Sequence, residues 1–318
     1  MARLLITRRM PPRTLDAARA AFDVTLRDDT QPLPLDAAVA ALAEHDAVLC
    51  SLGDAFTAEA FGCAAGLRCR IIANFGVGYN HIDTEAAAAA GIVVTNTPGA
   101  VTDATADIAL TLLLMTARRA GEGERLVRSG QWQGWHPTQM LGAHVTGKRV
   151  GIVGMGRIGK AIARRCHHGF GMEVLFFNRS EVAEPGVPAR QVATLAGLMS
   201  AVDFVVVAVP GGPATRHLLG HDALSAMQPH AILINIARGD IVEEAALIHA
   251  LQSGRIAGAG LDVYEHEPRV PEALRRLDRV TLLPHLGTAA LEVREAMGAM
   301  AVGNLTAFFA GNEPPNRV

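Results

Sequence analysis

KRVGIVGMGRIG, residues 148–159, is the stretch of this sequence that decides the fold. Residues 148–153 have the short apolar pattern of a buried strand, and residues 160–166 repeat apolar side chains at helical spacing. Between them stands Gly154-Met155-Gly156-Arg157-Ile158-Gly159, a G-x-G-x-x-G motif in the strand–turn–helix context that a dinucleotide-binding turn requires. We therefore expect residues 154–159 to bind a dinucleotide.

Each glycine of this motif has a physical reason. The first permits the tight turn, the second lets the backbone approach a pyrophosphate, and the third lets the helix pack closely on the strand. The N-terminus of the following helix offers N–H groups and a positive dipole end to the phosphates. The motif thus predicts a complete binding element rather than an ordinary glycine turn.

Composition narrows the class of protein. A chain of 318 residues suggests two domains, and half of it is hydrophobic, which is enough for sizeable cores. The net charge of −2, with acids and bases interspersed, indicates neither a nucleic-acid surface nor a polybasic membrane patch. We expect a soluble, cytoplasmic protein without a metal site. The cysteines form no C-x-x-C pair and are expected to be reduced; they are Cys50, Cys63, Cys69 and Cys166.

Strands and helices alternate along the chain. Expected strands span residues 3–7, 47–50, 70–74, 92–96, 148–153, 173–177, 204–209, 231–236, 258–262 and 280–283. Expected helices span residues 14–22, 84–90, 103–119, 160–166 and 285–311. This alternation is typical of parallel, doubly wound sheets, so the expected fold class is α/β with two Rossmann-like domains.

The order of these elements suggests an inserted domain. One α/β series precedes the glycine motif, a complete nucleotide-binding series follows it, and a lone helix ends the sequence. We expect a discontinuous substrate-binding domain, residues 1–98 and 289–318, interrupted by a dinucleotide-binding domain, residues 99–288. A cleft between two domains is a common place for a ligand.

Three polar residues follow the predicted strands of the second series. Arg238, Glu267 and His285 stand at or beyond strand ends, where ligands bind in open α/β sheets. An arginine can hold the carboxylate of a 2-oxo acid with two hydrogen bonds. A histidine can supply the proton that the carbonyl oxygen needs as hydride arrives, and a carboxylate on its far nitrogen would orient it.

Each residue alone also has a structural interpretation. Arg238 could cap its strand and pair with Asp240. Glu265 and Glu267 could be solvated loop acids, and His285, which follows a proline, could have a purely structural role. Their order after a dinucleotide motif favours the catalytic interpretation.

The sequence resembles the D-isomer-specific 2-hydroxyacid dehydrogenase family over essentially its whole length. The matching segments are Asn74-Phe75-Gly76-Val77-Gly78-Tyr79-Asn80-His81-Ile82-Asp83, Thr97-Pro98-Gly99, the glycine motif, Ala237-Arg238-Gly239-Asp240, Leu261-Asp262-Val263-Tyr264-Glu265-His266-Glu267-Pro268 and Pro284-His285-Leu286-Gly287. The resemblance implies that Arg238, Glu267 and His285 are catalytic, with Glu267 chosen over Glu265 because it directly precedes the proline.

The resemblance also implies binding residues. The expected substrate contacts are Leu52, Val77, Gly78, Arg238 and His285. Outside the glycine motif, the expected cofactor contacts are Thr105, Asn178, Arg179, Ser180, Val209, Pro210, Thr215, Ile236, Ala237, Arg238, Asp262, His285 and Gly287.

The cofactor is expected to be NADPH, with NADH possible. A fold that selects NAD places an acid at the end of the second strand, where this sequence has Asn178-Arg179-Ser180. Arginine suits a 2′-phosphate, which an acid would repel. An ordinary polar strand end is the alternative.

Residues 101–107 most resemble the glyoxylate and hydroxypyruvate reductases of the family. We therefore expect reduction of these acids to glycolate and D-glycerate by a homodimer. Trp135 either reaches the neighbouring active site or packs in the dimer interface. The alternatives are a D-lactate-type dehydrogenase using NADH and a nucleotide-sensing, corepressor-like binding protein.

Overall fold

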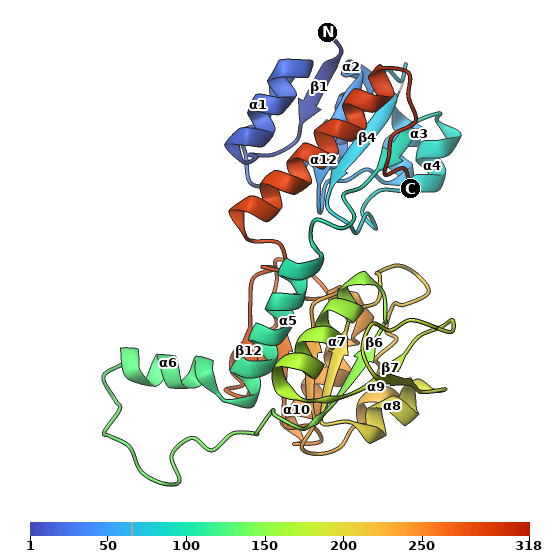
Figure 1. The fold of residues 1–318 in the computed structure, drawn as a ribbon. Coiled ribbons are helices and arrows are strands. Elements are labelled where there is room, and N and C mark those ends of the chain that lie inside the picture. The colour runs from blue at the N-terminus through green and yellow to red at the C-terminus, as the bar shows by residue number, and fades with distance from the viewer. Residues whose placement is uncertain (65) are drawn as a thin grey trace. The chain divides into compact units, whose positions relative to one another are not determined.

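The computed structural model describes residues 1–64 and 66–318, which form two compact units (Figure 1). The first unit contains Met1–Val101 and Thr288–Val318, and the second contains Thr102–Gly287. The second unit therefore interrupts the chain of the first, and each has its own sheet and its own hydrophobic cores.

The sheet of the first unit is wholly parallel, in the order β2-β1-β3-β4-β5. Its strands are β1 (Arg3–Ile6), β2 (Asp23–Leu26), β3 (Ala47–Ser51), β4 (Ile71–Phe75) and β5 (Val93–Thr95). One core packs beneath α1 (Pro12–Ala21) and α12 (Leu291–Phe309). The other packs beneath α2 (Leu35–Glu44), α3 (Ala58–Cys63) and α4 (Thr84–Ala89). Apart from the edge strand β2, which alternates exposed and half-buried residues, these strands have the buried apolar runs of a parallel sheet.

The sheet of the second unit is also parallel, in the order β12-β11-β10-β9-β6-β7-β8. Its strands are β6 (Arg149–Val153), β7 (Glu173–Phe177), β8 (Ala189–Gln191), β9 (Phe204–Val207), β10 (Ile232–Asn235), β11 (Gly258–Leu261) and β12 (Val280–Leu282). One face packs on α5 (Thr102–Ala117) and α7 (Arg157–Phe170). The other packs on α8 (Leu195–Ala201), α9 (His221–Ala226), α10 (Glu244–Gln252) and α11 (Glu272–Arg275).

The order of the second sheet reverses between β6 and β9. From β6 the chain proceeds through β7 to β8 at one side, then returns to pair β9 with β6 on the other. In doubly wound sheets, ligands bind outside the carboxyl ends of the strands at such a reversal. The topology therefore indicates that a ligand would bind at the turn after β6, which is the glycine motif.

A helix and a long irregular segment project from the second unit (Figure 1). The helix is α6 (Ala120–Arg128), and residues 129–148 after it contain no helix or strand. Large apolar side chains are exposed here: Val127, Trp132, Trp135 and Leu141. Among the described residues, no helix combines the length and hydrophobicity needed to cross a membrane.

The predicted fold class is confirmed, but one predicted helix starts too early. The sequence pattern predicts a helix over residues 285–311, whereas α12 begins at Leu291. Residues 285–290 form a loop, because the N–H groups of Leu286 and Gly287 donate to the Asp262 carboxylate. Several further elements are not predicted by the sequence pattern: β2, β8, α2, α3, α6, α8, α9, α10 and α11.

Candidate active site

The glycines of the turn after β6 occupy three different environments. Gly154 has φ of +102°, and a Cβ there would lie 2.7 Å from Cγ1 of Val209. A Cβ at Gly159 would lie 2.1 Å from the carbonyl oxygen of Gly154, so α7 could not approach β6 with a larger residue. A Cβ at Gly156 would meet nothing within 4 Å. Gly154 and Gly159 are therefore required for the close packing of the turn, β6 and α7. Gly156 leaves the backbone open, as the approach of a pyrophosphate requires.

The end of β7 supports this turn. Asn178 accepts a hydrogen bond from the N–H of Met155 through Oδ1 at 3.3 Å, and its Nδ2 donates to the carbonyl oxygen of Ser180 at 2.9 Å. Arg179 is exposed and forms no ion pair with any residue in the described part of the chain. Asn178 is thus an anchor of the glycine turn, whereas the guanidinium of Arg179 is available to a ligand.

Arg238 follows β10, where the backbone turns into a 3₁₀ helix, η1 (Gly239–Ile241). The Asn235 side chain holds this turn by donating from Nδ2 to the carbonyl oxygen of Arg238 at 2.9 Å. Arg238 donates from Nη1 to the carbonyl oxygen of Ala237 at 2.7 Å. Burial lowers the pKa of Arg238, although Glu267 and Asp240 act in the opposite direction. Arg238 is thus a partly buried cation whose position is set by the backbone turn after β10.

His285 and Glu267 form a direct pair. Nδ1 of the imidazole lies 2.9 Å from Oε2 of Glu267, and about a third of each side chain is exposed. Oε1 of Glu267 accepts from the N–H of Tyr264 at 3.1 Å. Burial raises the pKa of Glu267, but the His285 hydrogen bond and charge, the Tyr264 N–H and the charge of Arg238 outweigh it. The pKa of Glu267 therefore lies below its usual value, and the carboxylate stays ionised.

The loop that carries His285 is fixed by Asp262. The buried carboxylate accepts from the N–H of Leu286 at 2.7 Å and of Gly287 at 2.9 Å, and the Asp262 carbonyl accepts from the N–H of His285 at 2.9 Å. Thr105 of α5 adds a hydrogen bond from Oγ1 to the carbonyl oxygen of Gly287 at 3.1 Å. His285 itself has φ of +55°. Such a conformation is costly for a residue other than glycine and persists only when its surroundings impose it.

Asp262 and Tyr264 support the His285–Glu267 pair in a way that the sequence pattern does not predict. The Tyr264 hydroxyl lies 2.8 Å from the carbonyl oxygen of Leu283, so this buried ring secures the segment just before His285. Burial raises the pKa of Tyr264, which keeps its hydroxyl protonated and able to donate. Asp262 was expected as a cofactor contact, and its position directly after a buried strand was the available signal for an anchoring role.

The remaining expected cofactor residues follow β9 and β10. Val209 lies against Gly154, and Thr215 donates from Oγ1 to the carbonyl oxygen of Pro210 at 2.7 Å. Ile236 and Ala237 are buried between β10 and Arg238. These residues therefore follow β9, which borders the reversal of the sheet, and its neighbour β10.

The expected substrate residues Val77 and Gly78 lie in a loop of the first unit, after β4. Asn96 donates to the carbonyl oxygen of Val77 at 2.9 Å, and Asn74 donates to that of Gly78 at 3.0 Å. Within residues 1–64 and 66–318, no acceptor is found for the N–H groups of Val77 and Gly78. The loop thus has its carbonyl oxygens bonded and its donors available, as an anion-binding loop requires.

Leu52 belongs to a second loop of the first unit, organised by a buried acid. Asp54 accepts from Thr7 Oγ1 at 2.6 Å and from the N–H groups of Ser51 and Leu33, both at 2.8 Å. Arg8 donates to the carbonyl oxygen of Leu52 and pairs with Asp54 at 3.3 Å. Leu52 therefore has a fixed backbone position.

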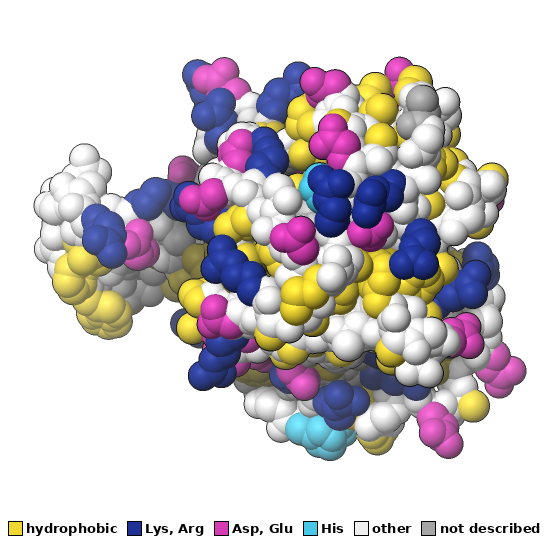
Figure 2. All heavy atoms as spheres, turned by 90° about the horizontal axis from the view of Figure 1, so that it is seen from above, with side chains coloured by type: hydrophobic (Ala, Val, Ile, Leu, Met, Phe, Trp, Pro, Cys, Tyr) yellow, Lys and Arg dark blue, Asp and Glu magenta, His cyan; other side chains and the backbone are white. Residues whose placement is uncertain are grey.

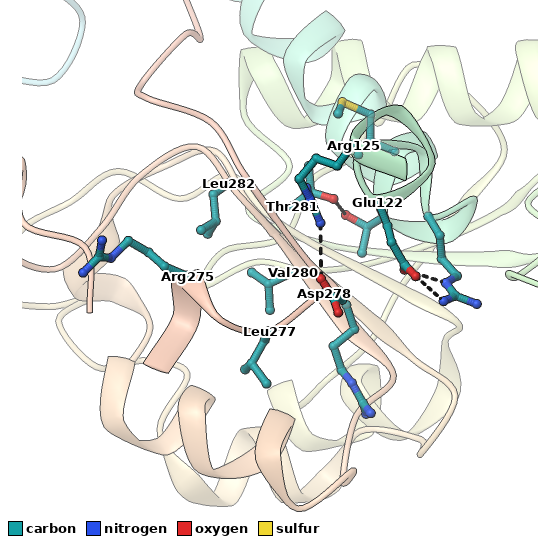
Figure 3. Close-up of a pocket in the computed structure, with 13 residues that line it drawn as sticks. Glu122, Arg125, Arg275, Leu277, Asp278, Val280, Thr281 and Leu282 are labelled. Atoms are coloured by element: carbon teal, nitrogen blue, oxygen red, sulfur yellow. Dashed lines mark hydrogen bonds and ion pairs between the residues drawn. The ribbon is translucent and has the colours of Figure 1, made fainter. Parts of the chain in front are cut away.

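A separate cavity of about 250 Å³ lies between α6, the end of α5 and the start of β12 (Figure 3). Two ion pairs line it, Arg119 with Glu122 and Arg125 with Asp278, and Arg275 and Arg279 line it as well. On the face drawn in Figure 2, basic and acidic side chains are interspersed. Across residues 1–64 and 66–318, no cluster of His, Cys, Asp and Glu has the arrangement of a metal site.

Comparison with known proteins identifies the family. Residues 110–287 match the model of "D-isomer specific 2-hydroxyacid dehydrogenase, NAD binding domain". The chain is 43% identical over 321 residues to a glyoxylate reductase of Thermococcus gammatolerans, covering 99% of this chain and 95% of that protein. It is 44% identical over 322 residues to a glyoxylate reductase of Pyrococcus horikoshii, with the same coverage of both chains.

Solved structures agree with the sequence relatives. The NADPH-dependent glyoxylate/hydroxypyruvate reductase of Sinorhizobium meliloti, in complex with NADP and malonate, superposes with a TM-score of 0.89 at 38% identity. That match covers 100% of this chain and 96% of the other. A glyoxylate reductase from Paecilomyes thermophila also has a TM-score of 0.89, at 31% identity, covering 100% of this chain and 98% of that one. The chain belongs to the D-isomer-specific 2-hydroxyacid dehydrogenase family and is an NAD(P)-dependent oxidoreductase.

Proposed function

We propose that this enzyme is an NADPH-preferring reductase of small 2-oxo acids, converting glyoxylate to glycolate and hydroxypyruvate to D-glycerate. The observation that carries the proposal is the His285–Glu267 pair, 2.9 Å apart and within the electrostatic influence of the partly buried Arg238. A proton donor and a carboxylate-binding cation are the groups that reduction of a 2-oxo acid requires.

The proposal gives each nitrogen of His285 a separate role. Because Nδ1 is hydrogen-bonded to Glu267, the Nδ1–H tautomer is favoured and Nε2 remains for the substrate. As proton donor the ring is protonated: Nδ1–H stays bonded to Glu267 while Nε2–H passes its proton to the carbonyl oxygen as charge gathers there. Arg238 binds the substrate carboxylate and carbonyl oxygen, which aligns C2. The reduced nicotinamide, when bound, supplies the hydride.

We assign the first unit to substrate binding and the second to the dinucleotide. The available N–H groups of Val77 and Gly78 would hold the substrate carboxylate, and Leu52 would form part of the pocket wall. In the second unit, residues 154–159 would hold the pyrophosphate and Thr105 would lie at the nicotinamide end. The open backbone at Gly156 supports this arrangement.

Preference for NADPH rests on the end of β7. No acid occupies Asn178-Arg179-Ser180, and the exposed guanidinium of Arg179 has the charge and planar geometry that a 2′-phosphate requires. The related reductase of Sinorhizobium meliloti is described as NADPH-dependent. An NADH-dependent, D-lactate-type dehydrogenase is the second candidate, since the pocket size is set by loops.

We further propose a cytoplasmic homodimer. A second copy would cover the exposed apolar side chains on α6 and the segment after it, including Trp132 and Trp135. Burial of such aromatic side chains is typical of protein interfaces. Trp135 either reaches the neighbouring active site or packs within the interface.

The testing experiment measures initial rates with NADPH and NADH in parallel. Each cofactor is combined with glyoxylate, hydroxypyruvate, pyruvate and a bulkier 2-oxo acid. We expect fast NADPH-linked reduction of the first two acids. Preference for NADH would contradict the proposed role of Arg179 in binding the 2′-phosphate. Absence of activity with every combination of cofactor and acid would favour a nucleotide-sensing protein.

A further inference from the structure

A second histidine–carboxylate pair lies beside the first one in the sequence. Glu265 contacts His217 rather than His285: Oε1 of Glu265 lies 2.7 Å from Nε2 of His217. The other carboxylate oxygen, Oε2, accepts from the N–H of Glu244 at the start of α10, at 3.3 Å. The Glu265 side chain is only 12% exposed. Glu265 and Glu267, two residues apart, therefore contact two different histidines, His217 and His285.

The backbone of His217 joins this pair to the segment that carries Arg238. The N–H of His217 donates to the carbonyl oxygen of Asp240 at 2.7 Å, and the N–H of Leu219 donates to that of Ile241 at 3.0 Å. His217 has φ of +52°, a conformation that only a few residue types other than glycine tolerate. The loop before α9 thus runs beside η1 and is fixed to it by hydrogen bonds.

The segment that carries Glu267 also lies directly on η1. A Cβ at Gly239 would fall 1.8 Å from the carbonyl carbon of Tyr264 and 2.0 Å from its oxygen. The backbone after Arg238 and the backbone before Glu267 are therefore in contact, and no other residue type fits between them. Any movement of one segment is transmitted to the other because packed backbones cannot interpenetrate.

We propose that His217 and Glu265 form a positioning pair for the catalytic residues. The contact between the His217 and Glu265 side chains fixes residues 264–267, the segment that includes Glu267. The N–H of His217 bonds to Asp240 and so fixes η1, the turn directly after Arg238. Neither residue needs to touch substrate. The pair acts through Glu267, whose carboxylate must stay within hydrogen-bond distance of His285. This inference rests on the proposed reductase function, because positioning is measured through turnover.

The test uses His217→Asn, with His221→Asn as the matched control. Asparagine tolerates positive φ and keeps the N–H to Asp240, but it is too short to reach Glu265. His221 begins α9, is exposed, and among the described residues forms an ion pair only with the exposed Asp222, at 3.6 Å. A displacement of about 1 Å can lower turnover by about 100-fold. We expect His217→Asn to lower kcat by about 5- to 50-fold, with the Kd for NADPH within about twofold of wild type.

A double-mutant cycle with Glu267→Gln separates positioning from general stability. If the pair acts through Glu267, His217→Asn causes almost no further loss of kcat in the Glu267→Gln background. Additive losses, or a kcat for His217→Asn equal to that of His221→Asn, would overturn the positioning role. Glu265→Gln provides a second variant, with the same expectation, if His217→Asn does not fold. A wild-type enzyme without reductase activity would overturn the proposed function itself, whereas an active wild type with an unaffected His217→Asn overturns only this inference.

Discussion

Nδ1 of His285 lies 2.9 Å from Oε2 of Glu267, and the other oxygen of that carboxylate accepts from the N–H of Tyr264. Glu267 is therefore bonded on both oxygens, one to the imidazole and one to its own loop. This arrangement fixes the orientation of the ring and leaves Nε2 as the nitrogen that a substrate can meet.

Replacing His285 by alanine tests the proton donor. General acid catalysis contributes about 100- to 10,000-fold, so His285→Ala is expected to lose at least about 100-fold in kcat. NADPH binding, measured by titration of nicotinamide fluorescence, is expected to be unchanged because the glycine turn is intact. His221→Ala serves as the control. A loss smaller than tenfold would remove the proton-donor assignment.

The pKa of Glu267 predicts how stability depends on pH. His285, Tyr264 and Arg238 together outweigh burial and hold this pKa below its usual value of 4.5. Folding therefore favours the carboxylate, so its contribution is present above pH 4.5 and is lost as the pH falls through the folded-state value. Between about pH 6 and pH 3, the Tm of wild type should fall more steeply than that of Glu267→Gln. Parallel curves would show that the pair does not stabilise the fold.

Arg179→Ala tests cofactor selectivity. A hydrogen bond to a charged group contributes about 1.5–3 kcal/mol, so the Kd for NADPH should rise by about 10- to 150-fold. The Kd for NADH should change by less than about twofold, because NADH lacks the 2′-phosphate. Arg190→Ala, an exposed arginine on β8, is the matched control. Equal weakening of both cofactors would contradict the assignment.

Gly159→Ala tests the packing of the glycine turn. The added Cβ would lie 2.1 Å from the carbonyl oxygen of Gly154, which forces α7 away from β6. Overpacking of this kind typically costs about 1–3 kcal/mol. Gly169→Ala, on the same helix with nothing within 4 Å of the added Cβ, should be neutral or stabilising by up to about 1 kcal/mol. Denaturant unfolding of both variants compares them directly, and similar stability would refute the contact.

Thiol labelling tests the burial of the cysteines. Burial raises the pKa of Cys69 and of Cys166 to about 12, and raises that of the fully buried Cys50 as well. Cys63 is exposed. With an aromatic disulfide reagent at about pH 8, we expect one rapid equivalent per chain, which Cys63→Ser removes. Rapid labelling of the Cys63→Ser variant would show that the cores open readily.

Local patterns predicted the glycine turn and most of the strands, because strand, turn and helix there are adjacent in sequence. They failed at residues 285–290, where apolar residues continue a helical pattern. There, Leu286 and Gly287 donate to Asp262, a partner distant in sequence that periodicity does not reveal. The separate pairing of Glu265 and Glu267 was equally inaccessible, since it depends on where the loop that carries His217 lies.

The interruption of the first unit by the second has a consequence for synthesis on the ribosome. Residues 291–309 form α12, which covers one face of the sheet formed by the N-terminal residues and contributes Ala301 and Leu305 to its core. Until that helix emerges, the nascent first unit exposes an apolar surface, whereas residues 102–287 already form a complete unit. Domains generally fold as units during translation, so the dinucleotide-binding unit should mature first. The first unit, although its chain begins before the second, would then be the later of the two to complete its fold.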